Sequence, residues 1–74
     1  MAVLVHLTLT AQDEQTVRYR YGPTPDDQPH SLVIDKVSRQ LLGSTDPDDR
    51  LVAGWICHQR QQRGRWLERG ILAS

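Results

Sequence analysis

Residues 45–64 read TDPDDRLVAGWICHQRQQRG, and this stretch decides the fold because it carries the signals of one amphipathic helix. A side-chain oxygen of Thr45 or Asp46 can accept hydrogen bonds from the first backbone N–H groups of the helix. Pro47 suits the first helical position, where a backbone donor has no partner within the helix. The two aspartates after it favour the positive end of the helix dipole. The stretch therefore predicts a helix that begins near residue 47.

The apolar residues of the same stretch recur at helical spacing and identify the face that packs on the rest of the chain. The residues predicted to form this buried stripe are Leu51, Val52, Trp55 and Ile56. Gly64 can adopt the left-handed conformation that ends many helices, and arginines in the turn before it suit the negative end of the dipole. The predicted helix covers about residues 47–63.

Two segments upstream of the helix alternate between the two faces of an extended chain, which is the pattern of half-buried strands. In the first, one face holds Val3, Val5, Leu7 and Leu9, and the other holds Leu4, His6, Thr8 and Thr10. In the second, one face holds Val17, Tyr19 and Tyr21, and the other holds Thr16, Arg18 and Arg20. The polar residues 13–15 have the length of a hairpin connection. The two segments are predicted to pair.

The remaining segments complete the predicted sheet. Residues 22–30 contain three prolines after a glycine and predict a loop. Residues 31–35 contain an apolar run that predicts a third strand, and residues 40–42 can return beside it as a short fourth strand. After the helix, the apolar residues of the tail can close either the sheet or the helix end; they are Trp66, Leu67, Ile71 and Leu72.

These elements predict one α+β domain over residues 1–74. A chain of 74 residues has room for a single core, and one helix must cover one apolar face of the sheet. The expected architecture is a two-layer sandwich. It has a three- to four-stranded antiparallel sheet in β-β-β-β-α order, one helix of about residues 47–63 on one face, and an apolar C-terminal tail.

Charge and cysteine content narrow the class of protein. Nine basic and nine acidic residues leave no net charge, so no overall field attracts a polyanion. Cys57 is the single cysteine, which excludes an internal disulfide and suits a reducing compartment. The first residues lack the basic segment of a signal peptide, and no run approaches the ~20 apolar residues that cross a bilayer. We therefore expect a cytoplasmic protein without membrane contact.

No motif predicts a catalytic, cofactor or metal site. Cys57 and His58 are neighbours on the predicted helix, so their side chains diverge by about 100° and cannot readily share an ion. The aspartates Asp46, Asp48 and Asp49 lack the turn glycine and the later glutamate of a calcium loop. A glycine-rich phosphate loop is also missing from the sequence. We expect no cofactor, and we do not expect the chain alone to be an enzyme.

Arginines provide the candidate contact residues. Two lie on the predicted outer face of the sheet. Three lie in the last turn of the predicted helix or just after it, ahead of a tryptophan that could stack on a base or pack on the core. The candidate contacts with a partner or a nucleic acid are Arg18, Arg20, Arg60, Arg63, Arg65 and Trp66. The group at the helix end has a second interpretation, as a solvated terminus with favourable dipole charges.

These observations favour a binding function over catalysis. A small open sheet has edge strands that can pair with another chain, so we expect a non-catalytic protein-interaction module, monomeric or homodimeric. An accessory, antitoxin-like or immunity-like role fits this class. The alternative is a weak nucleic-acid-binding protein that uses the arginine-rich helix end. A second alternative is a small subunit that contributes residues to the active site of a partner.

Overall fold

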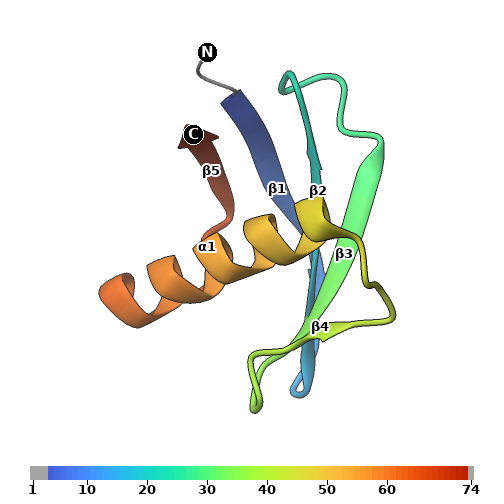
Figure 1. The fold of residues 1–74 in the computed structure, drawn as a ribbon. Helices are drawn as coiled ribbons and strands as arrows, with labels where there is room; N and C mark the ends of the chain where they lie inside the picture. Colours follow the sequence, from blue (N-terminus) through green and yellow to red (C-terminus); the bar gives the residue numbers. More distant parts are fainter. Residues whose placement is uncertain (1–3, 74) are drawn as a thin grey trace.

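The computed structural model describes residues 4–73 of the protein, and over this range it contains five strands and one helix (Figure 1). The elements are β1 (Leu4–Gln12), β2 (Thr16–Gly22), β3 (His30–Asp35), β4 (Leu41–Leu42), α1 (Pro47–Arg63) and β5 (Arg69–Ala73). The strands form one antiparallel sheet in the order β4-β3-β2-β1-β5, and α1 crosses one of its faces. The two-layer α+β architecture is confirmed. The strand position predicted for Val3 lies outside the described residues.

The helix has the ends that the sequence predicts. The side chain of Asp46 accepts a hydrogen bond from the backbone N–H of Asp48 at 2.8 Å, and Pro47 is the first helical residue. Gly64 follows the helix with φ of 75°, and its N–H donates to the carbonyl of Arg60 at 2.9 Å. Both ends depend on contacts within one turn, so the local sequence suffices to place them.

The β1–β2 hairpin is also as predicted, with one irregularity. Asp13 closes the turn because its Oδ1 accepts from the N–H groups of Gln15 and Thr16 at 2.8 and 2.7 Å. These backbone donors stabilise the ionised form and hold the pKa of Asp13 below its ordinary value. The pairing shifts by one residue between Leu9 and Ala11, which is a β-bulge.

The C-terminal tail is a fifth strand, so the prediction of three to four strands was too low. β5 pairs antiparallel with the first half of β1, from Leu4 opposite Ala73 to Thr8 opposite Arg69. The physical reason is that β1 would otherwise expose its unpaired N–H and C=O groups along this edge. Leu72 points to the helix side and is buried there.

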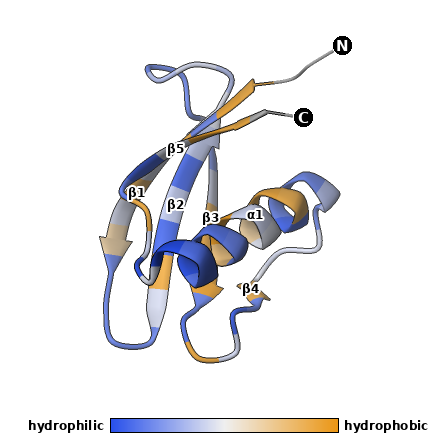
Figure 2. Cartoon of the chain, turned by 90° about the vertical axis from the view of Figure 1, so that its left-hand side faces the viewer, coloured by the Kyte–Doolittle hydropathy of each residue, from blue (hydrophilic) through white to orange (hydrophobic). Residues whose placement is uncertain are grey.

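The core lies between α1 and the inner face of the sheet. Its buried residues are Leu7, Val17, Tyr19, Tyr21, Leu32, Ile34, Val52, Ala53, Ile56 and Leu72. In Figure 2 both ends of α1 are hydrophilic, and its buried residues Val52, Ala53 and Ile56 lie in the middle of the helix. Among the described residues, no helix is long and apolar enough to cross a membrane.

The buried face of α1 differs from the predicted stripe. Val52, Ala53 and Ile56 are buried, Trp55 is half-buried, and Leu51 is 58% exposed. With 100° between successive helical residues, the three buried positions centre on a direction about 150° away from Leu51. The small side chain of Ala53 lies within this buried arc, which turns Leu51 toward solvent.

Candidate binding groove and free sheet edge

The outer face of the sheet, which points away from α1, carries a row of three polar residues on neighbouring strands. Thr8 on β1 lies opposite Arg20 on β2 and opposite Arg69 on β5. Directly paired residues have Cβ atoms about 4.5–5.5 Å apart, so both arginines begin beside the same threonine. Arg18 lies two residues before Arg20 on β2 and on the same face, and both arginines are exposed.

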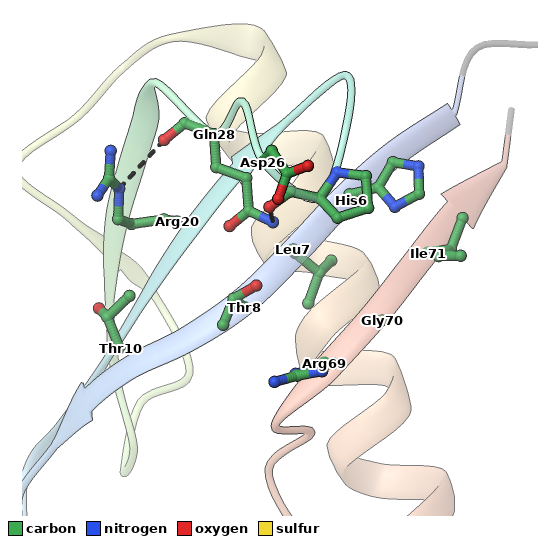
Figure 3. A pocket seen from close by; sticks show the side chains of 11 residues that line it. His6, Leu7, Thr8, Thr10, Arg20, Asp26, Gln28, Arg69, Gly70 and Ile71 are labelled. Atoms are coloured by element: carbon green, nitrogen blue, oxygen red, sulfur yellow. Dashed lines mark hydrogen bonds between the residues drawn. The ribbon is translucent and has the colours of Figure 1, made fainter.

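The loop after β2 folds back over this face and makes one wall of a groove. The Nε–H of Arg20 donates to the carbonyl of Gln28 at 3.1 Å, and the Thr24 hydroxyl accepts from the N–H of Asp27 at 2.9 Å. Figure 3 shows Thr8 and Arg69 on the groove floor, with Asp26 and Gln28 above them. The groove has a volume of about 820 Å³.

Gly22 permits the close approach of this loop. It is buried, and a Cβ atom at this position would overlap the carbonyl oxygen of Asp27 and lie 2.6 Å from the Cα of Gln28. Both are backbone atoms, so the loop as a whole would have to move to admit a side chain. The groove wall therefore depends on a glycine at the end of β2.

Replacing Gly22 by alanine should lower the free energy of unfolding by about 1–3 kcal/mol, because the added methyl group overpacks the contact with the loop. It should also break the bond from Arg20 to Gln28. The measurements are thermal unfolding and the NMR signal of the Arg20 Nε–H. Gly54→Ala is the matched control, because a Cβ there meets no atom within 4 Å. That helical change should stabilise by up to about 1 kcal/mol. Equal effects of the two variants would contradict the role given to Gly22.

The outer side of β5 forms an edge of the sheet. The N–H of Leu9 donates to the carbonyl of Glu68 at 2.8 Å, which fixes the alternation of hydrogen bonds between β1 and β5. By this alternation Gly70 and Leu72 direct their backbone groups to β1, whereas Arg69 and Ile71 direct theirs outward. Ile71 also exposes 56% of its surface, on the same face as the groove.

The arginines predicted as contacts fall into two separate groups. Arg18 and Arg20 lie on the outer face, and only Arg20 lines the groove. The others lie at the end of α1, on the opposite side of the sheet. There the Arg60 guanidinium lies 5.9 Å from the centre of the Trp66 ring, and Trp66 is half-buried against the core.

The two remaining members of the helix-end group are exposed. The Nε–H of Arg63 donates to the side chain of Gln59 one turn earlier at 3.1 Å. Arg65 follows the helix end. Arg69, which lines the groove with Arg20, was not among the contact residues predicted from the sequence. The missing signal was β5 itself, because Arg69 reaches the outer face only as part of that strand.

Cys57 does not have the environment of a reactive thiol. Its Sγ lies 3.5 Å from the carbonyl oxygen of Arg39, to which it can donate, and burial raises the pKa of the thiol. A higher pKa lowers the thiolate fraction, which is the nucleophilic form. Within residues 4–73, no three His, Cys, Asp or Glu side chains gather as metal ligands would.

A second hollow, of about 330 Å³, lies near the start of α1. It is lined by exposed Leu4 and Leu51 and by the buried residues Val52 and Leu72. Its rim includes His30, whose ring stacks on Tyr21 with 5.0 Å between the ring centres. The lining of this hollow is mostly apolar, with Asp48, His30 and Tyr21 as its ionisable members, whereas the outer groove combines several charged groups with hydrogen-bonding side chains.

Comparison with protein-family models, with curated proteins and with solved structures finds no match to this chain.

Proposed function

We propose that the protein is a non-catalytic protein-interaction module whose partner adds a strand to the outer edge of β5. The observation that carries this proposal is the outward direction of the backbone groups of Arg69 and Ile71 at the end of the sheet. An exposed strand edge is a template for pairing with another chain. The exposed Ile71 side chain supplies an apolar contact beside it. A cytoplasmic accessory role, antitoxin-like or immunity-like, is the form of this function that we propose.

The opposite edge of the sheet is less suited to such pairing. β4 has two residues, whereas β5 has five and contains neither proline nor a bulge. Short edge strands, prolines and bulges are among the devices by which proteins block unwanted pairing. β5 has none of these three, so it is the better template. A second copy of the chain could use this edge, with the two β5 strands antiparallel about Ile71.

Nucleic-acid binding by the end of α1 ranks below strand pairing. The Arg60 guanidinium lies over one face of Trp66, and the ring packs partly on the core. A base could stack on this ring only after Arg60 moved. The neutral overall charge adds no long-range attraction for phosphates.

The test uses short random peptides selected by display for binding to the protein, followed by amide exchange measured by NMR. In the dilute free protein, we expect the amides of Gly70 and Leu72 to be protected and those of Arg69 and Ile71 to exchange rapidly. Bound peptide should protect the second pair. Protection of the same two amides in concentrated protein alone would identify a second copy as the partner.

Ile71→Pro provides the decisive variant. It removes the outward N–H and leaves the bonds to β1 in place, since proline is tolerated on the solvent side of an edge strand. We expect loss of most of the peptide affinity. Ile71→Val is the matched control, because it keeps the N–H and the β-branched side chain. The proposal fails if no peptide or second copy protects Arg69 and Ile71, or if Ile71→Pro binds as well as Ile71→Val.

A further inference from the structure

From the side chains that surround the β5 edge, we infer that the partner strand carries an acidic side chain and an apolar side chain on the same face. It places a carboxylate opposite Arg69 and, two residues away, an apolar side chain opposite Ile71. This inference rests on the proposed strand pairing. A strand added to β5 directs every second side chain over the outer face of the sheet. The side chains of Arg69 and Ile71 are on that face.

The charge of the groove favours a carboxylate over other groups. Its lining contains the guanidinium groups of Arg20 and Arg69 and a single carboxylate, that of Asp26. A glutamate directly opposite Arg69 has its Cβ about 5 Å from that of the arginine, within reach of a paired, charge-assisted hydrogen bond. The apolar neighbour opposite Ile71 would cover the exposed part of that side chain.

Arg20 contributes at longer range. The added strand, β5, β1 and β2 are successive neighbours, and strands lie about 4.8 Å apart, so Arg20 begins about 14 Å from the partner backbone. Its Nε–H is held by the carbonyl of Gln28, which fixes the guanidinium above the groove. At this distance, beyond the Debye length of about 8 Å in physiological salt, it adds a weaker attraction.

A second copy of the chain would not place a carboxylate opposite Arg69. β5 reads RGILA, which contains no carboxylate. With two β5 strands paired about Ile71, the residue opposite Arg69 would be Ala73 of the copy. Self-pairing would therefore leave Arg69 without a partner charge, and this favours a segment from a different protein.

The test compares three synthetic strand-forming peptides that differ at one position, two residues from a valine. That position holds glutamate, glutamine or lysine. The glutamate peptide should bind about 5- to 10-fold more tightly than the glutamine peptide, and the lysine peptide more weakly than both. The preference for glutamate should shrink as salt is added.

Variants of the protein show which arginine causes the preference for the glutamate peptide. Arg69→Gln should remove it, Arg20→Gln should reduce it by less than about 3-fold, and Arg18→Gln should leave it unchanged. Arg18 is the matched control, because it is an exposed arginine on the same strand and face as Arg20 but does not line the groove. Arg69→Glu should reverse the order, so that the lysine peptide binds best.

The outcomes separate this inference from the proposed function. If all three peptides bind equally and protect the amides of Arg69 and Ile71, strand pairing stands and the acidic partner is excluded. If no peptide protects those amides, the proposed function fails as well. A single-stranded oligonucleotide that binds at the groove more tightly than the glutamate peptide would also overturn the inference.

Discussion

Replacing Ile56 by alanine should lower the free energy of unfolding by about 3 kcal/mol. Ile56 is 1% exposed and lies in the middle of the buried face of α1. The substitution leaves a cavity between the helix and the sheet, and it removes apolar surface that the fold has taken out of water. At 0.05–0.15 kcal/mol per residue, a domain of this size has a total stability of roughly 4–11 kcal/mol. The loss is therefore a large share of the total and should be measured by urea unfolding.

Leu51→Ala on the same helix is the control for this prediction. Leu51 is 58% exposed, so its truncation should change stability by no more than about 0.5 kcal/mol. The pair tests which face of α1 meets the sheet, because the two residues are similar in size and differ in burial. Equal losses would show that α1 does not turn Ile56 toward the sheet and Leu51 toward solvent.

The sequence predicted those parts of the fold that depend on local contacts. The cap at Asp46, the left-handed Gly64 and the Asp13 turn are each made within a few residues, and each was predictable. The face of α1 was predicted only in part. The apolar stripe is wider than the area that the sheet covers, and which half is covered depends on contacts across the layers.

The tail was predicted to close either the sheet or the helix end, and its own residues did not decide between the two because the inner face of β5 begins with a glycine. A Cβ at Gly70 would lie 3.0 Å from the Cη2 atom of Trp55, so the tryptophan ring occupies the space of an inward side chain. The expected apolar alternation of a strand is therefore missing at this position. Arg69 was not among the predicted contact residues for the same reason, although Arg18 and Arg20 were placed on the correct face.

The groove depends on a contact that the sequence pattern does not predict. Gly22 is an ordinary loop signal when it precedes a proline, and the local pattern predicts a turn there. That the loop then packs back on Gly22 and receives a hydrogen bond from Arg20 is a tertiary result. The outward position of Arg20 on β2 was therefore easier to predict than the loop that forms the wall of the groove.

The second large effect should appear at high pH, because the two tyrosines of the protein are both buried. Tyr19 is fully buried and donates to the carbonyl of Leu67 at 2.6 Å, and Tyr21 is 5% exposed and donates to the carboxylate of Asp49. Burial raises the pKa of both phenols above the ordinary value of 10.0, and for Tyr21 the bond to Asp49 raises it further. The folded protein therefore retains two protons that the unfolded chain releases.

Stability should consequently fall as pH rises above 10. In this range the unfolded state binds fewer protons than the folded state, so each phenol lowers the free energy of unfolding by up to about 1.4 kcal/mol per pH unit. While both phenols stay protonated in the fold, their contributions add, so stability falls about twice as steeply as it would with one phenol. We expect alkaline unfolding, with tyrosinate absorbance and loss of circular dichroism developing together.

Tyr19→Phe separates this linkage from general alkaline damage. At neutral pH the variant should be less stable by about 1 kcal/mol, because the carbonyl of Leu67 loses its donor. Above pH 10 it has one titrating phenol in place of two, so its stability should fall about half as steeply. The two stability curves should therefore converge and then cross as pH rises. Tyrosinate absorbance with a midpoint near pH 10, in wild-type protein that keeps its circular dichroism, would show instead that the phenols reach solvent in the fold.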